Sequence, residues 1–136
     1  MMINSIEIYI DGACQPNPGS GGIGIYVKGY GIEESFSIPL NGTVTNNIAE
    51  YQALIFALQL IKRKYLKSEK INIFSDSNLV CMHFNDQWKC KDKKLIPLLQ
   101  TAKDISLEFR KKIILSYIPR EENSIADSLA KDGIKK

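Results

Sequence analysis

The sequence predicts an α/β fold: a five-stranded mixed sheet with helices on both faces. Two observations predict it. Three strand-like segments separated by glycine-containing turns come first along the chain. After residue 45, segments with helical spacing alternate with short apolar strands. The resulting order, βββαβααβα, favours a three-stranded antiparallel meander extended by two parallel strands.

The meander is predicted from alternation and turns. Ile6, Ile8 and Ile10 alternate with polar residues, the period-two pattern of a half-buried strand, and Asp11 is predicted to end this strand before a Gly/Pro/Asn-rich turn. Because aspartate is disfavoured in strands, Asp11 needs a reason beyond local propensity. The three strands are predicted at residues 4–12, 23–27 and 33–40.

The rest of the chain is predicted to alternate helices and strands. Tyr51, Leu54, Leu58 and Ile61 recur at helical spacing in a first helix that reaches residue 66. Asn123 is predicted to cap the last helix. The later elements are a strand at 71–75, helices at 77–85 and 92–109, a strand at 112–118 and a helix at 123–132.

The composition indicates one globular domain spanning residues 1–136. The chain has 136 residues, of which 44% are hydrophobic, enough for one substantial core. No apolar run approaches the roughly 20 residues of a membrane span, and no signal peptide is recognised, so we expect a cytoplasmic protein without membrane contact. The three cysteines show no CxxC spacing, which argues against a disulfide framework or zinc site. A monomer is expected because no exposed apolar stripe is evident.

The net charge of +3 is unevenly distributed. Residues 1–61 carry one basic and five acidic side chains, whereas residues 62–136 carry 17 basic and 10 acidic ones. A basic surface beside a cluster of carboxylates is suited to binding a polyanion, with cations bound by the carboxylates contacting it. A solvated lysine-rich face also explains such a distribution of charge.

Four carboxylates are the candidate chemical groups. Asp11 and Asp76 are predicted at strand ends, and Glu50 and Asp127 in the first turns of helices, so all four can converge on one pocket. Carboxylates packed this closely repel one another unless a divalent cation neutralises them. Oxygen ligands favour Mg²⁺ or Mn²⁺, and such a set can hold two ions about 4 Å apart.

Each later carboxylate also has a purely structural interpretation. Glu50 fits a capping box with Asn47, and Asp127 at the start of a helix is favoured by the helix dipole. Asp76 can cap the helix that follows it. The four together favour chemistry more strongly than any one alone.

Five motifs together resemble the type 1 ribonucleases H, in the order and spacing of that family. A single Asp-Gly or Asp-Ser pair would carry little information, but the resemblance extends over essentially the whole chain. The motifs are residues 9–14 (YIDGAC), 17–22 (NPGSGG), 45–50 (TNNIAE), 74–77 (FSDS) and 123–130 (NSIADSLA).

The resemblance implies the ribonuclease H-like fold and an endonuclease that cleaves the RNA strand of RNA–DNA hybrids, leaving 5′-phosphate and 3′-hydroxyl ends. Asp11, Glu50, Asp76 and Asp127 would be catalytic residues and ligands of two Mg²⁺ ions, with Mn²⁺ as a possible substitute. Glu50 would also lie near the 2′-hydroxyl, which distinguishes RNA from DNA. Double-stranded RNA is a possible further substrate.

Substrate contacts are implied by the same motifs. Asparagine both donates and accepts hydrogen bonds, so it can contact sugars and base edges with little sequence preference. Turn and capping chemistry explains several of these residues equally well, and Cys14 is also consistent with packing. The implied substrate-binding residues are Cys14, Asn17, Thr45, Asn46, Asn47, Ser77 and Asn78.

Two departures from the family pattern stand out. Trp88 and the lysines at 89, 91, 93 and 94 resemble a shortened form of a basic protrusion that helps hold the duplex, with Trp88 expected in the core or a lid. The loop before the last helix lacks the histidine of many relatives. Arg120 is the candidate replacement, although it cannot act as a general base. His83, the only histidine, is expected on a partly exposed helix surface.

Two other classes of function remain open. One is a different nuclease or strand-transferase on the same fold, which cleavage of DNA-only substrates would favour. The other is a non-catalytic hybrid-binding module, which would gain stability by losing its carboxylates.

Overall fold

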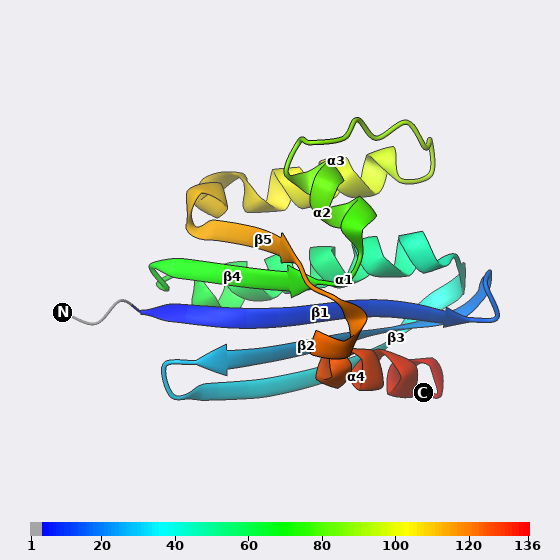
Figure 1. Cartoon of the computed structure of the whole chain (residues 1–136), viewed down its shortest axis with the longest axis horizontal. Helices are drawn as coiled ribbons and strands as arrows, with labels where there is room; N and C mark the ends of the chain where they lie inside the picture. The colour runs from blue at the N-terminus through cyan, green and yellow to red at the C-terminus, as the bar shows by residue number, and fades with distance from the viewer. Residues whose placement is uncertain (1–3) are drawn as a thin grey trace.

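The structure is a computed structural model in which residues 4–136 are described (Figure 1). Three short helical turns join the longer elements: Ile61–Tyr65 after α1, Leu107–Lys112 after α3 and Arg120–Glu122 before α4. The main elements are β1 (Ser5–Gln15), β2 (Gly19–Gly29), β3 (Ile32–Val44), α1 (Asn46–Leu60), β4 (Lys70–Ser75), α2 (Asn78–Phe84), α3 (Ile96–Ser106), β5 (Ile113–Tyr117) and α4 (Ser124–Ile134).

The sheet confirms the predicted fold class and element order. Its strands lie in the order β3-β2-β1-β4-β5; β1 to β3 are antiparallel, and β4 and β5 extend the sheet in parallel from β1. Ile10 of β1 pairs with Ser75 of β4. The next residues along the two strands, Asp11 and Asp76, therefore come to the same level of the sheet.

Helices cover both faces of the sheet (Figure 1). Ile6, Ile8 and Ile10 of β1 are almost fully buried and belong to the core that also contains Tyr51 and Leu54 of α1. On the opposite face α4 packs on the meander, so closely that a Cβ added at Gly24 would overlap the carbonyl oxygen of Ala126. Between residues 4 and 136 we find no helix with the length and apolar character needed to cross a membrane.

The first hairpin is longer than predicted, and the expectation that Asp11 ends a strand is wrong. β1 continues to Gln15, and Asp11 lies within it, paired with Gly24 of β2. The Gly-rich residues 19–22, predicted as a turn, instead begin β2. Glycine still supplies its backbone N–H and C=O to the ladder, and Gly22 makes room for α4, because a Cβ there would overlap the Ala130 carbonyl oxygen.

The helix boundaries also differ from those predicted. α1 ends at Leu60, before the predicted end at residue 66. A π-helical turn follows it directly and continues to Tyr65. The predicted helix 92–109 starts only at Ile96, with Pro97 in its first turn, where a missing N–H costs nothing. It gives way to a 3₁₀ turn at Leu107. α4 extends two residues beyond the predicted end, to Ile134.

Candidate active site

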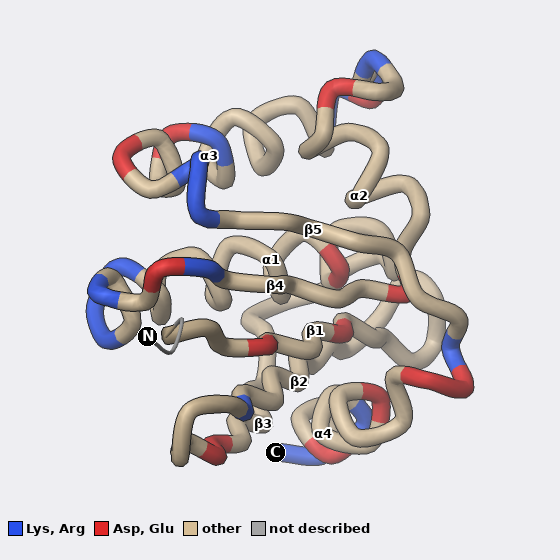
Figure 2. Tube along the Cα trace, turned by 60° about the vertical axis from the view of Figure 1, so that its left-hand side comes forward, with Lys and Arg blue, Asp and Glu red and all other residues tan. Residues whose placement is uncertain are grey.

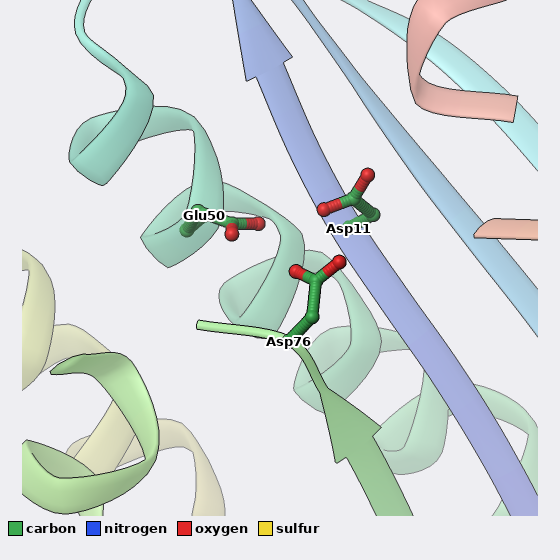
Figure 3. Close-up of side chains that lie close together, drawn as sticks. All are labelled: Asp11, Glu50 and Asp76. Atoms are coloured by element: carbon green, nitrogen blue, oxygen red, sulfur yellow. The ribbon is translucent and has the colours of Figure 1, made fainter. Parts of the chain in front are cut away.

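Three carboxylates from three elements point toward one another (Figure 3). Asp11 comes from β1, Glu50 from α1, and Asp76 from the end of β4. One oxygen of each lies within 4.8 Å of an oxygen of the others. Side chains separated by tens of residues in the sequence thus form one acidic cluster, as the sequence predicts.

Gly12 positions Glu50 against the sheet. A Cβ at residue 12 would overlap the carbonyl group of Ala49, so only glycine lets α1 approach β1 this closely. The Gly12 N–H donates to Glu50 Oε1 at 2.6 Å. Glu50 is therefore fixed by the backbone of the strand that also carries Asp11.

The predicted capping box at the start of α1 is not formed. Thr45 is the N-cap, and its Oγ1 accepts from the Ile48 N–H at 3.2 Å. Glu50 is the fifth residue of α1, beyond the first turn, and its Oε1 accepts from Gly12 instead. The structural interpretation of Glu50 as a capping residue is therefore wrong.

Asp76 is also not a capping residue. Ser77 caps α2, with its Oγ accepting from the Val80 N–H at 3.3 Å. Among the described residues, the buried Asp76 Oδ2 finds no hydrogen-bond partner. A buried carboxylate oxygen without a partner is unfavourable unless a cation binds it, because its lost hydration is not replaced.

Burial and mutual repulsion disfavour the charged form of this cluster. Burial raises the pKa of Asp11, and the neighbouring charges of Glu50 and Asp76 raise it further. Burial likewise raises the pKa of Glu50, with Asp76 as the next cause. Several converging carboxylate oxygens, one of them unpaired, are the donor set that hard divalent cations prefer. The residues present therefore fit a divalent metal ion.

Asp127 lies near the cluster without joining its closest group. It is in the first turn of α4 and, with Asp11 and Glu50, lines a hollow of about 320 Å³. Its Oδ2 lies 3.0 Å from the Lys131 Nζ. Sequence reasoning missed Lys131, although its spacing of one helical turn from Asp127 was a usable signal.

Asn123 holds the start of α4 against β1 but does not cap the helix with its side chain, contrary to the prediction. Its Nδ2 donates to the Ile10 carbonyl at 2.9 Å, and the residue is 1% exposed. Its Oδ1, the atom that would cap the helix, is buried and has no hydrogen-bond partner among the described residues, because the contact of Nδ2 with the strand holds the side chain toward β1. This contact ties the element carrying Asp127 to the residue before Asp11.

Three of the predicted substrate-binding residues form one polar group. Cys14 Sγ donates to Asn46 Oδ1 at 3.2 Å, and Asn17 Oδ1 accepts from the Asn46 N–H at 3.2 Å. Asn47 lines the same hollow as Cys14 and Asn46. Thr45 and Ser77 serve as helix caps, and Asn78 is exposed at the start of α2.

Arg120 lies beside the site, whereas His83 does not. Arg120 is exposed in the turn before α4 and lines the hollow with Asp127. The expectation for His83 is wrong: the residue is 6% exposed, and its Nδ1 lies 2.6 Å from the hydroxyl oxygen of Tyr51 in α1. Burial lowers its pKa. His83 is not among the residues lining the hollow.

The shortened basic loop is exposed. Trp88 is 47% exposed, so it is not a core residue, and it lines a separate hollow of about 250 Å³ with Lys89 and Cys90. The other three lysines of the loop, at 91, 93 and 94, are also exposed.

Comparison with known proteins identifies the family. The family model described as RNase H matches residues 3–135. A ribonuclease H of Caldanaerobacter subterraneus is 32% identical over 96% of this chain and 92% of its own length. A bifunctional protein of Mycobacterium tuberculosis is 31% identical over 95% of this chain, which spans only 35% of that relative's length.

Solved structures show the same fold. LC11-RNase H1, crystallised in complex with an RNA/DNA hybrid, superposes with a TM-score of 0.86 at 32% identity and covers 96% of both chains. RNase H1 of the archaeon Halobacterium salinarum superposes with a TM-score of 0.86 at 29% identity, covering 96% of this chain and 98% of its own. The chain belongs to the RNase H family.

Proposed function

We propose that this protein is a metal-dependent endoribonuclease that hydrolyses the RNA strand of RNA–DNA hybrids and leaves 5′-phosphate and 3′-hydroxyl ends. The observation that carries the proposal is the meeting of Asp11, Glu50 and Asp76 around the unpaired Asp76 Oδ2. The similarity to a ribonuclease H crystallised with a hybrid supports the substrate class.

Mg²⁺ is the proposed cofactor, with Mn²⁺ as a substitute. Asp11, Glu50 and Asp76 would hold the metal, and Asp127, which lines the same hollow as Asp11 and Glu50, would complete a site for a second ion. Such ions, when bound, would supply Lewis-acid chemistry: a lowered pKa for an attacking water and charge stabilisation at the leaving 3′ oxygen of a phosphodiester.

The protein's own side chains would orient the hybrid. The Gly12 N–H holds Glu50 so that its second oxygen is available to metal or to the 2′-hydroxyl of the RNA strand. Asn46 and Asn17, preorganised by their contacts with each other and with Cys14, would contact sugars or base edges in the minor groove. The exposed loop at Trp88 would add phosphate contacts through its lysines.

Arg120 is proposed to stabilise the departing phosphate. We expect Arg120→Ala to lower kcat about tenfold, since a charge-assisted hydrogen bond contributes about 1.5 kcal/mol or more. Metal affinity should stay unchanged, because Arg120 offers no ligand atom. Steady-state kinetics, with calorimetric metal titration of the free protein, measures both quantities. Arg120→Lys should retain part of the rate, and an unchanged kcat in Arg120→Ala would exclude Arg120 from the mechanism.

Metal affinity is expected to rise with pH. The raised pKa values of Asp11 and Glu50 mean that protons remain on the cluster near neutral pH, and a cation must displace them. Raising the pH removes these protons, so the Kd for Mg²⁺ or Mn²⁺ should fall, by up to about tenfold per pH unit for each proton displaced. Titration calorimetry in two buffers of different ionisation enthalpy would detect the released protons. A Kd that is constant between pH 6 and 9 would contradict this assignment.

Cleavage of an end-labelled RNA–DNA hybrid in Mg²⁺ or Mn²⁺ tests the proposed function. Matched double-stranded RNA and double-stranded DNA are the controls. Metal-dependent cuts confined to the RNA strand of the hybrid are expected. Cleavage of the DNA duplex would instead favour another nuclease on this fold, and tight hybrid binding without cleavage would indicate a binding module.

A further inference from the structure

A second basic surface lies away from the carboxylates. Figure 2 shows Lys- and Arg-rich segments gathered beside the starts of β4 and β5, where the chain leaves α1 and α3. We propose that this surface, the basic end, binds the phosphates of a single strand flanking the hybrid. The basic end consists of Lys62, Arg63, Lys67, Lys70, Lys111 and Lys112.

Contacts between distant segments make the basic end continuous. The Lys112 Nζ donates to the Leu66 carbonyl at 2.6 Å, which joins the start of β5 to the turn before β4. Ile71 pairs with Ile113, so Lys70 and Lys112 precede adjacent positions on neighbouring strands. Residues some 40 positions apart in sequence therefore present their charges on one side of the molecule.

Most of this positive charge is not neutralised within the protein. Lys62 pairs with Glu108 at 3.8 Å. Among the residues described, no ion pair involves Arg63, Lys67, Lys70 or Lys111, and Arg63, Lys67 and Lys111 are exposed. Lys62, Arg63 and Lys67 also line a hollow of about 540 Å³. Arg63 and Lys67 are thus unpaired cations in a concave surface, and a surface lined by charges of one sign attracts a polyanion.

The position of the basic end selects a single strand over a duplex. It lies at the start of β4, and Asp76 follows the end of this six-residue strand, about 20 Å away at the usual rise per residue. A duplex has a persistence length of about 50 nm and cannot bend around so small a protein. A single strand can, and once the hybrid is bound, its flank reaches the basic end at an effective concentration in the millimolar range.

This choice of occupant rests on the proposed function, whereas the charge of the basic end does not. An acidic protein segment is the alternative polyanion. We favour nucleic acid because a substrate held at the carboxylates already brings phosphates close to the basic end. The contacts would be independent of base sequence, since the lysine and arginine side chains of the basic end would bind phosphates, which carry no sequence information.

The test compares two hybrids that differ only in a single-stranded DNA tail of about 20 nucleotides. This tail is longer than the stretch of single strand that one binding surface on a protein usually contacts. The variant Arg63→Glu/Lys67→Glu/Lys111→Glu reverses three exposed charges outside the candidate active site. Wild-type protein should bind the tailed hybrid at least fivefold more tightly than the untailed one at low salt. The advantage should disappear in the triple variant, while cleavage of the untailed hybrid stays unchanged.

Salt dependence gives a second measure of the same contacts. If the three exchanged residues each contact a phosphate, the slope of log K against log salt for a labelled single strand should become less steep by about 2 in the variant. Lys89→Glu/Lys91→Glu, in the loop proposed to hold the duplex, is the matched control and should weaken binding of both hybrids equally. Binding of the isolated strand is measured by fluorescence anisotropy without cleavage, so it is informative even if the untailed hybrid is not cut.

Two results would overturn the proposal. One is equal affinity of the wild-type protein for the tailed and untailed hybrids at low salt. The other is a tail advantage that survives in the triple variant. If the variant instead loses only its affinity for polyglutamate, the basic end is a surface for an acidic protein.

Discussion

Asp11→Asn is expected to abolish metal-dependent cleavage and at the same time to stabilise the metal-free protein. The activity should fall by at least about 10³-fold, because the amide offers a weaker ligand at the centre of the acidic cluster and removes one charge that attracts the cation. Asp11 is only 4% exposed, and this burial disfavours its charged form. Replacing the carboxylate by a neutral amide removes that unfavourable charge and should stabilise the folded protein.

The direction of the stability effect follows from the raised pKa of Asp11. The pKa of Asp11 is higher in the folded protein than its value of about 4 in the unfolded chain. As the pH rises above about 4, the unfolded chain releases the proton of Asp11 while the folded protein still holds it. The free energy of unfolding therefore falls with rising pH. The folded protein is therefore destabilised at pH 8 relative to a variant with a neutral amide. We expect Asp11→Asn to raise the free energy of unfolding by about 1–3 kcal/mol there.

Urea unfolding at pH 5 and pH 8 in the presence of a chelator measures this effect. The difference between wild type and Asp11→Asn should be larger at pH 8. Asp132→Asn, an exposed position in the same helix as Asp127, is the control and should change neither activity nor stability. If Asp11→Asn has a lower free energy of unfolding than the wild type at pH 8, the charged form of Asp11 does not destabilise the folded protein.

Gly12→Ala is expected to damage both the fold and the site. The new Cβ would overlap the Ala49 carbonyl, which is backbone and cannot rotate away, so α1 must move off β1. Overpacking typically costs about 1–3 kcal/mol, and the overlap with backbone atoms places this substitution at the upper end of that range. The movement would also break the bond from the Gly12 N–H to Glu50 and separate Glu50 from Asp11, so metal affinity should fall more than tenfold.

Gly31→Ala is the matched control for that substitution. An alanine Cβ at Gly31 meets nothing within 4 Å, and the φ of +79° there costs about 1 kcal/mol for an L-residue. Gly31→Ala should therefore lose about 1 kcal/mol of stability and keep its metal affinity. Equal stabilities of the two variants in urea titrations would contradict the role assigned to Gly12.

The sequence was sufficient to predict the sheet and the acidic cluster because both follow from local patterns. Ile6, Ile8 and Ile10 reveal a half-buried strand through alternation, and they lie in the core. Asp11 and Asp76 follow residues that pair across β1 and β4, so parallel pairing alone brings them together. The motifs then identify which acids belong to one site.

Features that depend on contacts between distant elements could not be predicted in this way. The environment of His83 depends on Tyr51, 32 positions earlier, and nothing in the amphipathic pattern of α2 reveals that contact. Asn123 satisfies the sequence rule for a capping residue, yet its side chain is engaged by Ile10 of β1. Gly22 of β2 was expected in a turn, because a single sequence does not show that α4 will lie over it.

The hydrogen bond between Gly12 and Glu50 gives this protein an internal spectroscopic reporter. Because the Gly12 N–H donates to Glu50 Oε1, with 2.6 Å between nitrogen and oxygen, any change of charge or coordination at that carboxylate alters the shielding of the amide proton. Its NMR resonance would follow occupancy of the acidic cluster without a label in the site. The Gly12 amide hydrogen, held between β1 and α1, would exchange with solvent only when these two elements separate. Its exchange rate would therefore report how often β1 and α1 separate at the acidic cluster.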